Sequence, residues 1–188
     1  YRTDQVGCIP GILDLWFAQR VEYKNEMKKY GKSGNKEKYA FFHKRQLVQK
    51  ILLNSLYGVL GLPAFRFYDV DNAEAVTTTG QTVIKSTADM ANIKYNKELN
   101  TPDADSNIYI DTDSVFFSAV PLMDKRYKGW KEKDQDTIAG YVNVIAEEMQ
   151  DYLNDFYNIL SKKIFNVDKD KHRLEIKKEY VAKAGLWI

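Results

Sequence analysis

Two stretches near the start of the chain repeat their apolar residues at the spacing of an α-helix. They cover residues 12–29 and 37–60, and positions three and four apart share one face of a helix. Residues 30–35 between them are rich in glycine, serine and asparagine, which favour a tight connection. The pattern predicts two long helices joined by a short loop, and therefore an antiparallel helical hairpin.

The rest of the chain mixes helical and strand patterns. Further helices are predicted over residues 73–95 and 136–163. Between them, two β-rich runs at residues 107–110 and 114–117 are so close in sequence that a β-hairpin is the simplest interpretation. Residues 173–181 alternate polar and apolar side chains, which predicts another strand. Helices packed with an antiparallel sheet define an α+β fold.

The composition is that of a globular protein, with 44% hydrophobic and 29% charged residues. No apolar run approaches the roughly eighteen residues of a membrane-spanning helix, and the first residues lack the layout of a signal peptide. We therefore expect a cytoplasmic protein that is not secreted and has no membrane partner. The single cysteine, Cys8, suits a reducing compartment, and its apolar neighbours predict that it is buried.

Charge is distributed unevenly although the net charge is only +2. Residues 1–50 carry 11 Lys/Arg against 5 Asp/Glu, residues 51–160 carry 9 against 17, and residues 161–188 carry 8 against 4. Basic ends around an acidic middle would suit a polyanion held around a carboxylate centre. A mixed, solvated surface explains the same distribution, and on charge alone it is the simpler interpretation.

Two aspartates, Asp111 and Asp113, stand one residue apart between the two predicted strands. Paired carboxylates repel each other unless a cation binds between them. Hard divalent ions such as Mg²⁺ take carboxylate oxygens, and two such ions can hold the entering and leaving oxygens of a phosphoryl transfer. A polar turn without chemistry is the alternative that this motif alone leaves open.

Polar residues at helical spacing mark both helices of the predicted hairpin. Lys50, Asn54 and Tyr57 share one face of the second helix and offer a cation, an amide and an aromatic ring. Arg20 and Lys24 lie one turn apart on the first helix, where two cations suit a triphosphate. Solvated surface residues would show the same spacing.

Taken in order, these motifs resemble those of family B DNA polymerases, most closely the replicative polymerases of tailed phages. Lys50-x-x-x-Asn54-Ser55-x-Tyr57-Gly58 is similar to one family motif. Tyr109-x-Asp111-Thr112-Asp113-Ser114 is similar to a second, and Lys177-Lys178-x-Tyr180 to a third. The resemblance implies that residues 1–61 are the fingers and residues 62–188 the C-terminal part of the palm.

For the fingers, the resemblance implies an enzyme that binds deoxynucleoside triphosphates. Arg20, Lys24 and Lys50 would hold the triphosphate of the incoming nucleotide, with Lys50 also counted among the catalytic residues. Asn54 would help to place the triphosphate, and Tyr57 would pack beside the nascent base pair.

For the palm, the resemblance implies that Asp113 and Asp111 are catalytic and bind two Mg²⁺ ions, with Mn²⁺ as a substitute. Lys178 and Tyr180 would contact primer–template DNA, as would Gly58 on the fingers. The reaction would be nucleotidyl transfer from a deoxynucleoside triphosphate to a primer 3′-hydroxyl.

The resemblance also implies parts that this sequence does not carry. In the family, a further motif supplies another metal-binding aspartate, and an N-terminal domain, an exonuclease and a thumb are present. We expect them in the same or a second chain, and we expect this chain alone to be a weak or inactive polymerase. Two alternatives remain open: a noncatalytic nucleic-acid-binding module derived from a polymerase, and a metal-dependent nucleotide-sugar transferase.

Overall fold

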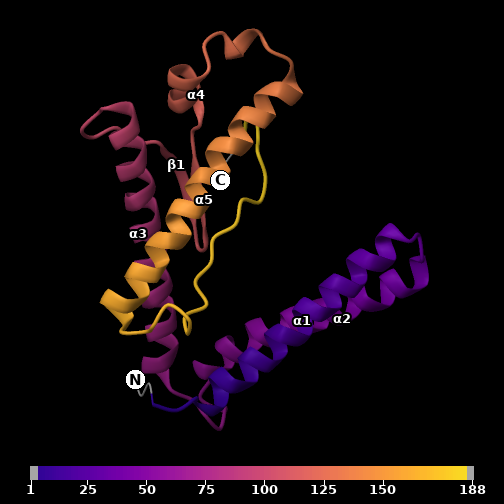
Figure 1. Ribbon diagram of the computed structural model, residues 1–188. Coiled ribbons are helices and arrows are strands. Elements are labelled where there is room, and N and C mark those ends of the chain that lie inside the picture. Colours follow the sequence, from indigo (N-terminus) through magenta and orange to yellow (C-terminus); the bar gives the residue numbers. More distant parts are fainter. Residues whose placement is uncertain (1–3, 186–188) are drawn as a thin grey trace. The chain divides into compact units, whose positions relative to one another are not determined.

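The computed structural model describes residues 4–185, which form two compact units. The first unit ends at Thr77 and the second begins at Thr78. The chain combines helices with a sheet: its described residues form five α-helices, a short 3-10 helix and a two-stranded antiparallel sheet (Figure 1). The predicted α+β class is therefore confirmed. The predicted division at residue 61 into fingers and palm differs from the boundary between these units and stays a prediction.

The first unit is dominated by the helical hairpin of α1 (Cys8–Lys32) and α2 (Lys36–Leu60) (Figure 1). Asn35 caps α2, because its side chain accepts a hydrogen bond from the Lys38 amide at 3.1 Å. Between the helices, the rings of Tyr30 and Phe42 stack with 5.6 Å between their centroids. The predicted antiparallel hairpin is thus confirmed.

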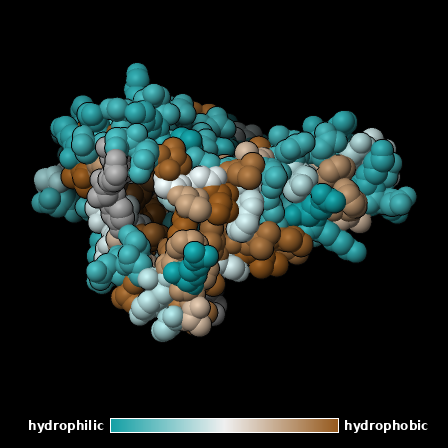
Figure 2. Space-filling model, turned by 90° about the horizontal axis from the view of Figure 1, so that it is seen from below, coloured by the Kyte–Doolittle hydropathy of each residue, from teal (hydrophilic) through white to brown (hydrophobic). Residues whose placement is uncertain are grey.

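A two-helix layer leaves most of its side chains in contact with water. Among the described residues, none of α1 is buried, and α2 buries only Gln49 and Leu60. Cys8 is exposed at the first position of α1, so the prediction that it is buried was wrong. Its apolar neighbours lie at the start of α1, which buries no side chain among the described residues. On the face drawn in Figure 2, hydrophobic side chains accordingly appear among hydrophilic ones.

The second unit packs three helices around one apolar core. They are α3 (Val70–Leu99, which begins in the first unit), α4 (Val120–Arg126) and α5 (Gln135–Phe165), with the 3-10 helix η1 (Trp130–Glu132) before α5. The buried cluster consists of Ala91, Tyr95, Leu122, Met123, Ile145, Met149 and Leu153. The predicted long helices are present, whereas α4 and η1 were not predicted.

Polar contacts tie the same three helices together. Arg126 on α4 donates to both carboxylate oxygens of Glu98 on α3 and forms an ion pair with Glu148 on α5 at 2.7 Å. The Arg126 hydrogen bonds hold the pKa of the Glu98 carboxyl below its ordinary value. In the core, Thr87 Oγ1 and Tyr157 Oη lie 2.8 Å apart and join α3 to α5.

The strand predicted over residues 173–181 was wrong. The only sheet among the described residues pairs β1 (Asn107–Asp111) with β2 (Ser114–Phe117). Residues 172–180 have no strand assignment and run beside α5 instead (Figure 1). Their alternation is nevertheless visible in burial, because even-numbered residues from 172 to 178 are half-buried and odd-numbered ones exposed. No helix among the described residues is long and apolar enough to cross a membrane.

Candidate nucleotide, metal and DNA site

The β1–β2 hairpin presents the two aspartates at its tip. Asp111 pairs with Ser114 in the last register position, so Thr112 and Asp113 form the turn. The Asp113 amide donates to the Asp111 carbonyl oxygen at 2.5 Å, which closes the turn tightly. Thr112 has a φ of 46°, a conformation that is strained for a β-branched residue. The local structure therefore places both carboxylates at an exposed, strained turn.

Both carboxylates face solvent, but their surroundings differ. One oxygen of Asp111 accepts a hydrogen bond from Thr112 Oγ1 at 2.9 Å. The Asp113 side chain has no hydrogen bond or ion pair within residues 4–185. Mg²⁺ is commonly held by one or two carboxylates together with substrate phosphates and waters, so this donor set fits the ion. Among the residues that the structure describes, no third carboxylate, histidine or cysteine joins the pair.

Aromatic contacts connect the hairpin to the C-terminal segment. The Phe116 ring lies 6.0 Å from the Tyr109 ring across the strand pair and 5.9 Å from the Tyr180 ring. The second unit therefore brings Tyr180 of the predicted DNA-binding motif to the strand that follows the two aspartates. The Lys178 ammonium donates to Asn143 Oδ1 at 2.8 Å and pairs with Glu147 at 3.2 Å. Sequence patterns had not indicated these two partners on α5.

The first unit presents the predicted nucleotide-binding residues on the surface of the hairpin. Lys50, Asn54, Tyr57 and Gly58 are all exposed on α2, and an added Cβ at Gly58 would meet no atom within 4 Å. Within the described chain, the side chains of Lys50, Asn54 and Tyr57 make no hydrogen bond or ion pair. Their shared face is thus unobstructed by other side chains of this unit.

The cations of α1 occupy a different environment. Arg20 is half-buried, and its Nε is buried without a hydrogen-bond partner in the described residues. Lys24 is exposed one turn further along. Beside these positions, Gln49 Nε2 donates to Gln19 Oε1 at 2.5 Å and ties the two helices together. This partly buried amide pair therefore fixes α1 against α2 next to Arg20 and Lys50.

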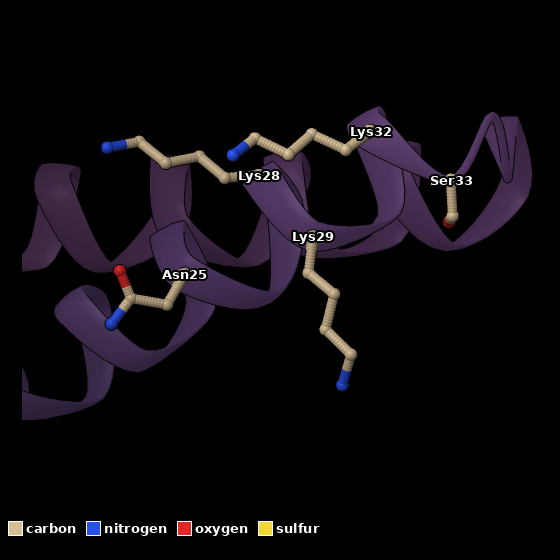
Figure 3. Close-up of a pocket in the computed structure, with 5 residues that line it drawn as sticks. All are labelled: Asn25, Lys28, Lys29, Lys32 and Ser33. Carbon is tan, nitrogen blue, oxygen red and sulfur yellow. The ribbon is translucent and has the colours of Figure 1, made fainter.

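The row of cations continues to the loop end of α1. Lys28 and Lys32 follow Lys24 at four-residue spacing and line an open depression together with Asn25, Lys29 and Ser33 (Figure 3). In Figure 3, Lys28 and Lys32 extend side by side, whereas Lys29 points away from them and pairs with Glu26 at 3.3 Å. Lys28 and Lys32 were not predicted as site residues, although they continue the four-residue spacing of Arg20 and Lys24 in the sequence.

Comparison with known proteins identifies the class to which this fold and these motifs belong. The family model for DNA polymerase family B matches residues 2–131, which is more than half of the chain. The chain therefore belongs to DNA polymerase family B, and the predicted family is confirmed.

Individual relatives include DNA polymerases of two phages and of Thermococcus gorgonarius. The DNA-directed DNA polymerase of Enterobacteria phage T4 is 36% identical over 121 residues, covering 58% of this chain and 13% of that protein. The DNA-directed DNA polymerase of Escherichia phage RB69 is 41% identical over 80 residues, covering 43% and 9%. The DNA polymerase of Thermococcus gorgonarius is 28% identical over 185 residues, covering 98% and 22%. The chain thus spans 9% to 22% of the length of these relatives.

Proposed function

We propose that this chain supplies the nucleotide-binding fingers and the C-terminal part of the palm of a template-directed DNA polymerase. The observation that carries the proposal is the exposed Asp111–Asp113 pair at the tip of a β-hairpin. The chain belongs to family B and also exposes Lys24 and Lys50 on its helical hairpin. Carboxylates kept at a strained turn, with Asp113 lacking a polar partner within the described residues, are suited to binding a cation.

The chemistry would be nucleotidyl transfer. The primer 3′-hydroxyl loses its proton, and its oxygen bonds to the α-phosphorus of a deoxynucleoside triphosphate. The bond between that phosphorus and the oxygen bridging it to the β-phosphorus breaks, and pyrophosphate leaves. Asp113 and Asp111 would hold Mg²⁺, or Mn²⁺ in its place, which when bound stabilises negative charge on the phosphates. Placing two carboxylates at the edge of the hairpin keeps them within reach of solvent and substrate.

The helical hairpin would bind and orient the nucleotide. Lys50, Lys24 and Arg20 would neutralise the triphosphate, because cationic side chains donate strongly to phosphate oxygens. Asn54 would donate an amide hydrogen to the same group, and Tyr57 would pack against the base pair. The absence of competing partners for Lys50 and Asn54 in the described residues supports a role in binding something outside the chain.

Primer–template DNA would be the macromolecular partner, contacted by Lys178, Tyr180 and Gly58. A complete centre would also draw on segments beyond these residues, in the same or a second chain, including another metal-binding carboxylate, the exonuclease and the thumb. The short share of each relative that the chain covers supports this view. A cytoplasmic location stays a prediction.

Primer extension tests the proposal. The chain is assayed alone and with a second polypeptide carrying the upstream palm segment, using Mg²⁺, four deoxynucleotides and a primed template. We expect little or no extension by the chain alone and extension once the segment is added. Asp113→Ala should abolish that extension while leaving DNA binding intact.

Two results would contradict it. Extension that persists in Asp113→Ala would exclude the aspartate from catalysis. DNA binding without extension under every combination, insensitive to Asp113→Ala and to divalent ions, would favour the noncatalytic binding module.

A further inference from the structure

The C-terminal segment runs beside one row of polar side chains on α5. Gln150, Asn154 and Asn158 recur every four residues and form what we call the amide stripe. Figure 1 shows the segment passing along this helix. Because residues four apart lie on one face of a helix, the three amides point toward the same neighbour.

The amide stripe bonds the segment as a neighbouring strand would. Asn154 Nδ2 donates to the Ile176 carbonyl oxygen at 3.0 Å, and Asn154 Oδ1 accepts from the Ile176 amide at 2.9 Å. Gln150 Oε1 accepts from the Lys178 amide at 2.9 Å. The Asn154 amide thus bonds both the N–H and the C=O of Ile176, as a residue of a neighbouring strand would. Gln150 then bonds the N–H of Lys178, two residues further along the segment.

The other end of the stripe holds the segment through a histidine. Asn158 Oδ1 lies 3.0 Å from His172 Nε2, and the Leu174 amide donates to His172 Nδ1 at 3.2 Å. Since Nδ1 accepts a hydrogen bond, Nε2 is the nitrogen that carries the proton and donates to Asn158. The contacts therefore run antiparallel to α5 from residue 158 to residue 150.

The two repeats match in length. Four residues of α-helix advance about 6 Å, and two residues of extended chain advance about 6.6 Å. Side chains spaced by four on α5 can therefore meet every second amide of an extended segment. This match explains why residues 173–181 alternate like a strand although they pair with no strand in the described chain.

We propose that the amide stripe positions Lys178 and Tyr180 for contact with primer–template DNA. This inference rests on the DNA-binding role proposed above for these two residues. With Ile176 fixed on Asn154, the Lys178 ammonium reaches Glu147 and Asn143, about two and three turns from Asn154 toward the start of α5. The Tyr180 ring reaches Phe116. A shift of the segment by one residue would turn Lys178 to the opposite side. Gln150, Asn154 and Asn158 are thus positioning residues, not DNA contacts.

Asn154→Leu in the 188-residue chain tests the proposal, with Asp155→Leu as the matched control. Asp155 is the next residue on α5 and is exposed, and its side chain makes no hydrogen bond or ion pair within the described range. Amide hydrogen exchange should accelerate about tenfold or more over residues 174–178 in Asn154→Leu, because opening the segment no longer breaks the paired bonds. Asp155→Leu should leave that exchange unchanged.

Affinity for a primed DNA duplex at low salt supplies the second measurement. Asn154→Leu should weaken binding by as much as Lys178→Ala does, about fivefold to tenfold. Asn154→Asp keeps the acceptor for the Ile176 amide but loses the donor, so it should fall between wild type and Asn154→Leu in both measurements. Gln150→Leu provides a second variant, which should release the Lys178 amide alone.

Each failure has a separate meaning. Unchanged exchange in both Asn154→Leu and Gln150→Leu would overturn the amide stripe as the element that holds the segment. Accelerated exchange with undiminished DNA affinity, while Lys178→Ala does lose affinity, would overturn the positioning role alone. If Lys178→Ala itself binds DNA as wild type does, the proposed DNA contact fails and the positioning role with it.

Discussion

Tyr157 Oη lies 2.8 Å from Thr87 Oγ1 in the buried layer between α5 and α3. Thr87 Oγ1 also lies 2.7 Å from the Val83 carbonyl oxygen, which can only accept. The threonine hydroxyl therefore donates to Val83, and the tyrosine donates to the threonine. Burial raises the pKa of the Tyr157 hydroxyl, so it remains a donor across the neutral range.

Thr87→Val should cost more stability than Tyr157→Phe. The first change leaves the tyrosine hydroxyl buried without its acceptor, at about 2 kcal/mol, whereas the second removes the donor and costs about 1 kcal/mol. The double variant should recover part of the loss, because no buried hydroxyl is then left unpaired. Urea unfolding of all three variants measures this, and equal, additive losses would contradict it.

Tyr95→Phe provides the opposite case in the same core. The Tyr95 hydroxyl is fully buried and has no hydrogen-bond partner among the described residues. Removing it should leave the free energy of unfolding unchanged or raise it by up to about 1 kcal/mol, because an unpaired buried polar group is lost. A loss comparable to that of Tyr157→Phe would show that the hydroxyl is paired.

Glu98 should make the chain sensitive to acid. Its hydrogen bonds with Arg126 hold the folded-state pKa below the ordinary 4.5. The resulting stabilisation is complete above the unfolded-state pKa and is lost as the pH falls through the lowered folded-state pKa. Glu98→Gln should therefore flatten the fall in stability below about pH 4.5. Glu22→Gln, at an exposed position of α1, is the control and should leave the slope as in wild type.

Thr112→Gly should stabilise the β-hairpin. Thr112 has a φ of 46°, which glycine adopts without the steric cost that a β-branched residue carries. After allowing for the greater freedom of glycine in the unfolded chain, we expect a gain of about 1 kcal/mol. Thr112→Ala, which keeps a Cβ, should gain less. A loss of stability in Thr112→Gly would mean that the hydroxyl bond to Asp111 outweighs the strain.

Gly58→Ala should separate stability from DNA binding. The added methyl group meets no atom within 4 Å, and alanine favours a helix over glycine by about 1 kcal/mol. Stability should rise by that amount, while affinity for primed DNA should fall if DNA approaches this face. Gly80→Ala on α3 is the matched control, since its added Cβ is equally unobstructed. It should show the stability gain without the loss of affinity.

Regular elements with strong local patterns could be predicted from the sequence. The helix predicted over residues 37–60 is Lys36–Leu60, and the strand predicted over residues 114–117 is Ser114–Phe117. Both patterns persist long enough, or are flanked by clear enough turn residues, to select one structure. The position of Asp111 and Asp113 at a hairpin tip followed from the same signals.

Features that depend on distant contacts could not be predicted in this way. The alternation of residues 173–181 indicates an extended chain but not its partner, and the partner is a helix carrying Asn154. Likewise, nothing local to Lys178 indicates that Glu147 lies 3.2 Å from it. The exposure of Cys8 depends on how many layers cover the hairpin, which its apolar neighbours do not determine.

The open face of α2 has a consequence for mutational tolerance. Lys50, Asn54 and Gly58 contribute little to the packing of their own unit, because they are exposed and the two polar side chains lack partners within the described residues. A library screened only for protease resistance should accept most substitutions there. The same library screened for DNA synthesis by the assembled enzyme should reject them. The positions at which the two screens disagree would outline the part of α2 that serves the proposed polymerase function and not folding.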